Sequence, residues 1–289
     1  MISLKKPEDS VKDVFTKCIG NIRDEKLKEK LNFCLPSIVN ITDEYEDKAK
    51  EGLLYQIEEH DNICGLVTTN EMKKIYTDKF AKNGQPGRKY YDIYMTIPKY
   101  GTCPFCGQRK VSTIDHFLAK TKFPSLAVSP INLVPACQDC NKIKGDKSFK
   151  SIEEQILHPY FDNIDSEEWL VAKIIKGSEI TIIFEIRCPE NGDEILYKRI
   201  KKHFDDFKLN ILYSSHAAGE LVSSFLTFQM MYNVKGSQGL KEYLDIVYKS
   251  KKMARVNSWE TAMYKALSES EWFCSEGIEI MKRELCLSR

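Results

Sequence analysis

The chain has 289 residues, of which 42% are hydrophobic and 29% are charged, close to the usage of average soluble proteins. This balance argues against a disordered chain and against a membrane protein, since no apolar run reaches the roughly 18 residues of a transmembrane helix. The polar start, Met1 to Asp13, lacks the apolar core of a signal peptide, so we expect a cytoplasmic protein.

The net charge of +1 gives no sign of a uniformly basic nucleic-acid-binding protein, but the charge is uneven along the chain. Between Lys99 and Lys150, nine Lys or Arg stand against three Asp or Glu, a local excess of six. Because the total is +1, the rest of the chain carries a net charge of −5. We therefore expect any attraction to phosphate groups to be local to the middle segment.

Residues 1–98 are predicted to be helical, because apolar residues recur at helical spacing. In the first helix these are Val11, Val14, Phe15, Cys18 and Ile22. Pro36 is expected to interrupt the next helix, and further helices are predicted over residues 41–59 and 69–80. The Gly- and Pro-rich stretch 83–88 marks a break, after which residues 90–97 are expected to be extended.

The second half of the chain begins with a short predicted helix over residues 152–157. Two β-prone runs, residues 169–175 and 179–186, flank Lys176-Gly177-Ser178 and predict a β-hairpin. Beyond Asn191-Gly192 the chain is expected to be helical to its end. The expected fold is therefore α+β and mainly helical: a helical region 1–98, a central module 99–150, and a region 151–289 with the hairpin and C-terminal helices.

Four of the ten cysteines form two C-x2-C pairs, with thirty residues between Cys106 and Cys137. Such paired thiolates suit a tetrahedral zinc ion, and Gly107 suits the tight turn that follows the first pair. The sequence thus predicts a structural zinc held by Cys103, Cys106, Cys137 and Cys140. The other six are expected to be free thiols, most of them in the core: Cys18, Cys34, Cys64, Cys188, Cys274 and Cys286.

Between the two pairs stand an acid and an imidazole, Asp115 and His116, after the β-prone run 111–114. Such a pair alone is most simply two hydrogen-bonded side chains on the surface. Its position between the two C-x2-C pairs of the expected zinc site favours a functional site. The other histidines lack partnered spacing and are expected to be structural: His60, His158, His203 and His216.

Taken together, Asp115-His116, Asn132 and the sequence Cys140-Asn141 resemble the HNH (ββα-metal) endonuclease family, in a zinc-knuckle form with asparagine at the third motif position. The resemblance covers about 45 residues, 103–147. It implies a β-hairpin and a helix around one divalent ion, with Asp115 as a metal ligand and His116 as the general base. It also implies that Asn132 holds the imidazole by a hydrogen bond and that Asn141 ligates the metal.

Two different metals are therefore expected. Thiolates hold zinc, whereas a carboxylate with an amide oxygen suits Mg²⁺ or Mn²⁺ for phosphodiester hydrolysis. Lysines near the motif are candidates for contacts with the DNA backbone, although they could also form a solvated basic face. They are Lys120 and Lys122 in the loop and Lys142, Lys144 and Lys147 around the following helix.

The resemblance implies an endonuclease acting on double-stranded DNA, and its likeness to HNH effectors of bacterial defence implies an anti-phage or restriction role. No phosphate-binding G-x-x-x-x-G-K-[ST] loop is present in the sequence, so no motor or energy-dependent switch of its own is expected. A nuclease without a visible target-reading domain needs restraint, and the helical flanks are expected to bind a regulatory or ATPase protein partner. Two alternatives stay open. The chain could be an inactive zinc-knuckle module that binds nucleic acid or serves as a scaffold, or a nicking or RNA-directed nuclease inside a larger complex.

Overall fold

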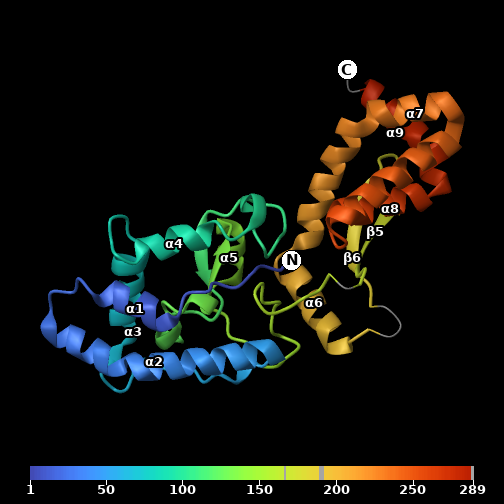
Figure 1. The fold of residues 1–289 in the computed structure, drawn as a ribbon. Coiled ribbons are helices and arrows are strands. Elements are labelled where there is room, and N and C mark those ends of the chain that lie inside the picture. Colours follow the sequence, from blue (N-terminus) through green and yellow to red (C-terminus); the bar gives the residue numbers. More distant parts are fainter. Residues whose placement is uncertain (166, 189–191, 288–289) are drawn as a thin grey trace. The chain divides into compact units, whose positions relative to one another are not determined.

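The computed structural model describes residues 1–165, 167–188 and 192–287. Asn191, at the expected start of the C-terminal helices, and the side chain of Cys286, an expected free thiol, lie outside this description. The chain forms two compact units, Met1–Asn163 and Ile164–Arg289. The described residues are mainly helical with three two-stranded sheets, which confirms the expected fold class (Figure 1). None of the described helices is long and apolar enough to cross a lipid bilayer.

The first unit begins with α1 (Val11–Ile19) and α2 (Glu25–Glu51). Ser10 and Asp24 cap their N-termini by accepting hydrogen bonds from backbone N–H groups. The expected interruption at Pro36 is wrong, because α2 continues through it. Pro36 and Asn32, whose carbonyl loses its helical partner, are both exposed, so water can replace the missing hydrogen bond while the opposite face stays packed.

Short elements follow: η1 (Leu54–Gln56), the hairpin of β1 (Asn62–Ile63) and β2 (Val67–Thr68), α3 (Thr69–Lys74) and the π-helix η2 (Ile75–Ala81). The predicted helix 41–59 therefore ends early, at the left-handed Gly52. The prediction for residues 90–97 is also wrong, since α4 (Arg88–Met95) is helical. The buried Tyr90 and Tyr94 lie one turn apart, and packing of that face overrides the β-propensity of the aromatic residues.

The central module contains η3 (Lys99–Gly101), β3 (Thr113–His116), η4 (Pro124–Leu126), η5 (Pro130–Asn132), β4 (Leu133–Ala136) and α5 (Gln138–Lys144). β3 and β4 pair antiparallel, and both strands are largely buried. Ile114, Ala127, Val128 and Leu133 belong to the same hydrophobic core as α1, α2 and the π-helix. The module is thus packed into the N-terminal helices of its unit.

The helix predicted over residues 152–157 is absent from the structure, which has a single turn there. The N–H of Gln155 donates to the carbonyl of Ile152, and the chain then continues to Pro159 without regular secondary structure. Ile156 and Leu157 are both buried, so these adjacent side chains pack as a loop rather than as one helical stripe.

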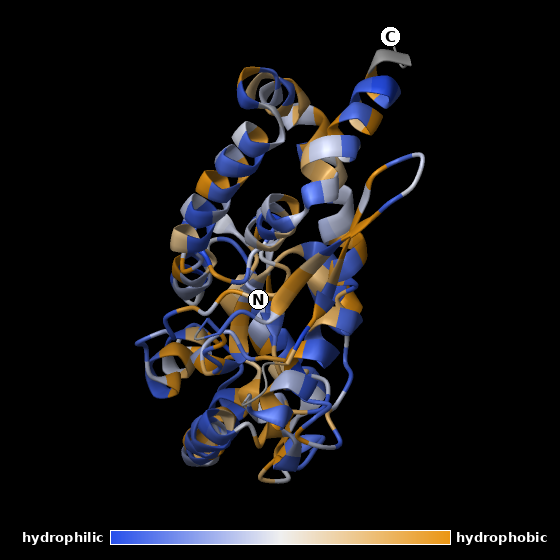
Figure 2. Ribbon diagram, turned by 90° about the vertical axis from the view of Figure 1, so that its right-hand side faces the viewer, coloured by the Kyte–Doolittle hydropathy of each residue, from blue (hydrophilic) through white to orange (hydrophobic). Residues whose placement is uncertain are grey.

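The second unit contains β5 (Leu170–Ile175), β6 (Thr181–Ile186), α6 (Glu194–Asp206), α7 (Leu209–Ala254), α8 (Trp259–Glu269), the π-helix η6 (Phe273–Gly277) and α9 (Ile278–Leu287). The expected hairpin is confirmed, with Leu170 opposite Ile186. α8 packs on β5 and α7 on β6. Apolar and polar residues alternate around the helices, as expected for amphipathic elements (Figure 2).

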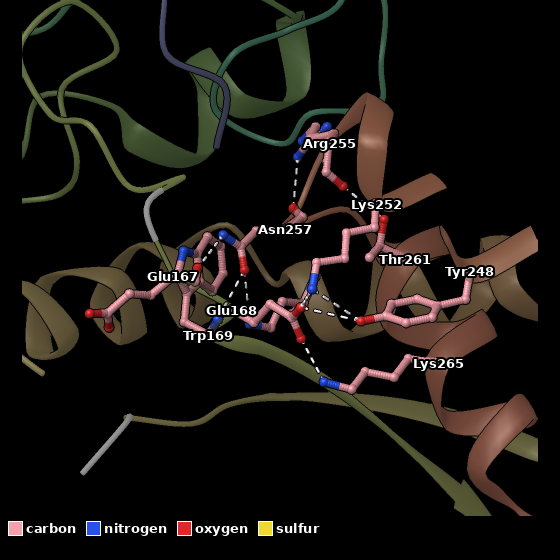
Figure 3. Close-up of polar contacts among 10 residues, drawn as sticks. Glu167, Glu168, Trp169, Tyr248, Lys252, Arg255, Asn257, Thr261 and Lys265 are labelled. Atoms are coloured by element: carbon pink, nitrogen blue, oxygen red, sulfur yellow. Dashed lines mark hydrogen bonds and ion pairs between the residues drawn. The ribbon is translucent and has the colours of Figure 1, made fainter. Parts of the chain in front are cut away.

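Two polar side chains join the elements of this unit (Figure 3). The buried Asn257 accepts from the N–H of Trp169, 3.0 Å away, and donates to the carbonyl of Glu167. Lys252 and Lys265 both pair with Glu168. Burial would raise the pKa of Glu168, but hydrogen bonds from the two ammonium groups lower it to about 2. These contacts tie the start of β5 to the ends of α7 and α8.

Candidate metal centre and active site

Four buried cysteines gather at one end of the β3–β4 hairpin. Their sulfur atoms all lie within 4.8 Å of one another, and they come from Cys103, Cys106, Cys137 and Cys140. Sulfurs about 2.3 Å from a tetrahedral zinc lie roughly 3.8 Å apart, so the cluster fits this ion. The second pair is placed by α5, because Cys137 is its N-cap and Cys140 lies in its first turn.

Backbone amides and one cation surround these sulfurs. The N–H of Arg109 lies 3.4 Å from Sγ of Cys106, and the N–H of Cys140 lies 3.4 Å from Sγ of Cys137. Gly107 adopts a φ of 66°, the left-handed region that its predicted turn requires. Arg109 also pairs with Asp139 at 2.8 Å and carries its positive charge beside the thiols. Such donors and charge stabilise thiolates, which is the form that binds zinc.

Asp115 and His116 are the last two residues of β3, opposite Val134 and Leu133 of β4. They are consecutive residues, and the positive charges of Lys120 and Lys144 act on both side chains. Both are nearly enclosed, with exposed fractions of 5% and 4%. The pair therefore lies in the interior of the unit, not on a polar surface as a lone Asp-His pair would.

The imidazole of His116 has one nitrogen engaged. Its Nε2 lies 2.9 Å from the carbonyl oxygen of Ala127. Because a carbonyl only accepts, Nε2 must carry the proton. Burial lowers the pKa of His116 well below its usual range, and the positive charge of Lys120 adds to this effect. His116 is consequently neutral, with the lone pair on Nδ1.

The carboxylate of Asp115 is only partly compensated. Its Oδ2 lies 3.4 Å from Nζ of Lys144, and this buried oxygen accepts no hydrogen bond from the described residues. Burial raises the pKa of Asp115 to about 6, against the lowering effect of Lys144. An incompletely paired, buried carboxylate oxygen is chemically suited to a divalent cation. Asn141 lies one turn before Lys144 on α5, on the same side of the helix, and is half-buried.

Asn132 makes different hydrogen bonds from the one expected. Its Oδ1 accepts from the N–H of Leu118 at 2.8 Å, and its Nδ2 donates to the carbonyls of Leu118 and Leu126. No hydrogen bond joins it to His116, whose ring is held by Ala127. Asn132 therefore closes the loop that carries Ala127, and acts on the imidazole only through that loop.

The candidate phosphate-binding lysines occupy unlike environments. Lys144 is buried and donates to the carbonyls of His116 at 2.7 Å and Phe117 at 3.2 Å. Lys122 pairs with Glu59 at 3.1 Å and donates to Ser148. Lys142 and Lys147 are exposed. Lys144 thus connects α5 to the end of β3, and the exposed pair is better placed for solvent or a ligand.

Lys120 and Tyr76 lie beside His116. Nζ of Lys120 is 5.0 Å from the ring centre of Tyr76, and burial lowers the pKa of Lys120. The Tyr76 ring stands edge-on to the His116 ring, with centroids 4.3 Å apart, and its hydroxyl donates to the carbonyl of Ile114 at 3.2 Å. Sequence reasoning missed Tyr76, because nothing in the spacing of the N-terminal helices marks it. Its place in a π-helix is a feature often found at functional sites.

Comparison with known proteins identifies the module. Residues 103–147 match the family model described as HNH endonuclease. The chain carries an HNH domain. Protein ea31 of Escherichia phage lambda is 27% identical over 94% of this chain and 99% of its own length. Septu protein PtuB of Bacillus thuringiensis is 25% identical over 70% of this chain and 88% of its own length. No solved structure matches the chain.

The HNH domain contains the four cysteines and each expected catalytic residue, but it does not contain every side chain at the site. Tyr76 on the π-helix and Glu59 before the β1–β2 hairpin come from the N-terminal helical region. The similarity to the phage protein likewise extends over nearly the whole chain. Residues of the N-terminal helical region therefore contact the HNH domain and help to position its side chains.

Proposed function

We propose that the chain is a metal-dependent endonuclease that hydrolyses phosphodiester bonds of double-stranded DNA. One observation carries the proposal. A single strand of the HNH domain, beside the four-cysteine cluster, ends in a buried neutral histidine with Nδ1 as its basic nitrogen. This histidine directly follows a carboxylate with a buried oxygen that accepts no hydrogen bond from the described residues. These are the two groups that hydrolysis at neutral pH needs, a base and a ligand for a cation.

In the proposed mechanism, Nδ1 of His116 accepts a proton from the attacking water. The carbonyl of Ala127 holds the Nε2 proton before and after this transfer, so the ring does not have to turn. Tyr76 limits its motion from the other side. Asp115 and Asn141 would hold Mg²⁺ or Mn²⁺, which supplies stabilisation of the charge that develops on the phosphate. The four cysteines would hold zinc, which fixes the start of α5 and hence Asn141.

Basic residues of the same module support contact with DNA. The excess of positive charge between residues 99 and 150 coincides with the HNH domain. Lys142 and Lys147 are exposed, and Lys120 lies beside His116 and Asp115. We propose that these three lysines contact backbone phosphates, whereas Lys122 and Lys144 act mainly through the contacts that they make within the protein.

The test is a plasmid-cleavage assay with Mg²⁺ or Mn²⁺. His116→Ala should lower the cleavage rate by roughly 100-fold or more, the usual scale for a lost general base, with zinc content and DNA affinity unchanged. His216→Ala, which removes an exposed histidine of the second unit, serves as the matched control and should cleave at the parental rate. Asp115→Ala should also lose activity. Raising the Mn²⁺ concentration should recover part of the activity of Asp115→Ala but none of the activity of His116→Ala.

A second candidate function, an inactive zinc-binding nucleic-acid module, is favoured by the burial of the two reactive side chains. The same assay separates the two functions. Parental protein that binds DNA and zinc but shows no cleavage above that of His116→Ala would support the inactive module.

We further propose a cytoplasmic role in bacterial anti-phage defence or restriction, together with a regulatory or ATPase protein partner. The likeness of the motif to HNH defence effectors and the similarity to a Septu protein support this role. The experiment is phage challenge of cells that carry the gene with its neighbouring genes, compared with the His116→Ala variant. Equal plaque numbers for the two would contradict the role.

A further inference from the structure

Two cysteines outside the HNH domain lie close together in the first unit. Cys34 is buried on the inner face of α2, one turn before Ser37. Cys64 is exposed at the turn between β1 and β2. The zinc site uses neither thiol, and the proposed hydrolysis does not require them.

Each of the two sulfurs makes a hydrogen bond to a residue near the other cysteine. Sγ of Cys34 lies 3.5 Å from the carbonyl oxygen of Ile63, the residue before Cys64. Sγ of Cys64 lies 3.0 Å from Oγ of Ser37, on the face of α2 that carries Cys34. Burial, together with a side-chain hydrogen bond to the Cys64 thiol, raises the pKa of Cys34 to about 11. The contacts cross in both directions, so the two sulfurs face each other.

The backbone at Cys64 is unusual and fixes the direction of its thiol. Its φ is 54°, a conformation uncommon for residues other than glycine, and it precedes Gly65 with a φ of 68°. The N–H of Gly65 donates a hydrogen bond to Oδ1 of Asn62 at 2.7 Å, which closes the same turn. The tight turn thus presents an exposed thiol toward a buried one on the neighbouring helix.

We propose that Cys34 and Cys64 are a thiol-oxidation site, at which a peroxide converts the two thiols into a disulfide. In the first step the Cys64 thiolate attacks a peroxide oxygen, so that an S–O bond forms, the O–O bond breaks and water leaves after protonation. In the second step the Cys34 sulfur attacks the Cys64 sulfur. The S–S bond forms, the S–O bond breaks, and the departing hydroxide takes the proton of Cys34. The thiols lose two electrons, which the peroxide gains, and the products are one disulfide and two waters.

The disulfide would join α2 to the β1–β2 hairpin, which leads directly into α3 and the π-helix that carries Tyr76. A disulfide that closes the loop between Cys34 and Cys64 lowers the conformational entropy of the unfolded chain more than that of the folded chain. Oxidation should therefore raise the melting temperature of the protein by roughly 5 °C, an effect that reduction reverses.

The experiment treats the full chain with hydrogen peroxide, blocks remaining thiols by alkylation, and maps tryptic peptides without reduction. The expected product joins peptides 31–48 and 51–73, each of which contains a single cysteine, and disappears on reduction. Zinc release is measured in parallel, because it reports oxidation of the four zinc thiols. The comparison is made at peroxide levels that oxidise Cys188. The proposal would be overturned if both peptides were recovered only in alkylated form, or joined only to other cysteines.

Variants sharpen the result. Cys64→Ser removes the exposed thiol and should abolish the joined product and the rise in melting temperature, whereas Cys188→Ser, at another exposed thiol, should change neither. Ser37→Ala keeps both cysteines but removes the hydrogen bond to Cys64, and should slow formation of the product by roughly 5-fold. An unchanged rise in melting temperature on oxidation of Cys64→Ser would overturn the assignment. None of these readouts depends on nuclease activity.

Discussion

The zinc end and the reactive end of the HNH domain share one hairpin, but different kinds of contact hold them. At the zinc end, four sulfurs from two sequence pairs gather within 4.8 Å, and amides of the same short turns support them. At the reactive end, His116 depends on Ala127, eleven residues further on, and on Tyr76, forty residues before it. The first arrangement is built from two short C-x2-C pairs of the domain, and the second also needs Tyr76, which lies outside the domain.

This difference predicts how each end responds to damage. A metal site in which four ligands share one ion contributes to folding itself, so loss of one ligand affects the whole unit. A base positioned by two weak contacts affects the rate of reaction and leaves the fold intact. The predictions below test this separation, beginning with the largest expected effect.

Cys137→Ser should release zinc and destabilise the first unit, because Cys137 belongs to the four-sulfur cluster proposed to hold zinc and is also the N-cap of α5. Elemental analysis and thermal unfolding measure the two effects. Cys274→Ser, at a buried cysteine of the second unit, is the control and should retain zinc. Full zinc content and an unchanged melting temperature in Cys137→Ser would show that the four sulfurs do not form a metal site.

Tyr76→Leu should lower kcat by roughly 10-fold with little change in KM, because the imidazole loses the ring that limits its orientation. Tyr76→Phe keeps the ring beside His116 and loses only the hydrogen bond to Ile114, so it should recover most of the rate. Tyr90→Leu, at another buried tyrosine of the unit, controls for general destabilisation. If the Leu and Phe variants both cleaved at the parental rate, Tyr76 would have no role in orienting His116.

The smallest expected effect is a pH dependence of stability. The folded-state pKa of Asp115, about 6, lies above its unfolded value of roughly 3.9. The folded protein therefore binds the proton more tightly between these values, and its stability falls as pH rises through this window. Asp115→Asn does not titrate and should lack this fall, which amounts to about 1–3 kcal/mol.

Denaturant unfolding of the two proteins between pH 4 and pH 8, without added divalent cation, measures this difference in the free energy of unfolding. Any constant effect of the substitution on Lys144 cancels in the comparison of slopes. Added Mg²⁺ should reduce the fall in the parental protein, because it binds the ionised carboxylate. Parallel curves without Mg²⁺ would show that burial does not shift the pKa of Asp115.

The sequence was informative where the determinants are local. The C-x2-C pairs predicted the sulfur cluster, and the two β-prone runs around Gly177 predicted the β5–β6 hairpin. It failed where tertiary packing decides the outcome. The buried face of α2 carries the helix through Pro36, and burial of Tyr90 and Tyr94 makes residues 90–97 mostly helical.

The same division applies inside the site. Asp115, His116 and Asn141 could be chosen from motif spacing, and their roles remain proposals. The hydrogen-bond partners of Asn132 and the approach of Tyr76 could not be predicted, because they depend on how the loop 117–132 folds against the π-helix. Spacing along one chain carries no information on contacts between segments that meet only in three dimensions.

The buried ammonium group of Lys144 has a consequence for ligand binding. It stands 3.4 Å from the Asp115 carboxylate and donates to three backbone carbonyls, which hold it in place. If Asp115 holds a divalent cation as proposed, this fixed positive charge would repel it, and a DNA phosphate that arrives beside both of them would relieve the repulsion. Cation and DNA should therefore strengthen each other's binding by the same factor, as thermodynamic linkage requires. The domain would then hold its catalytic ion firmly only while a phosphodiester is within reach.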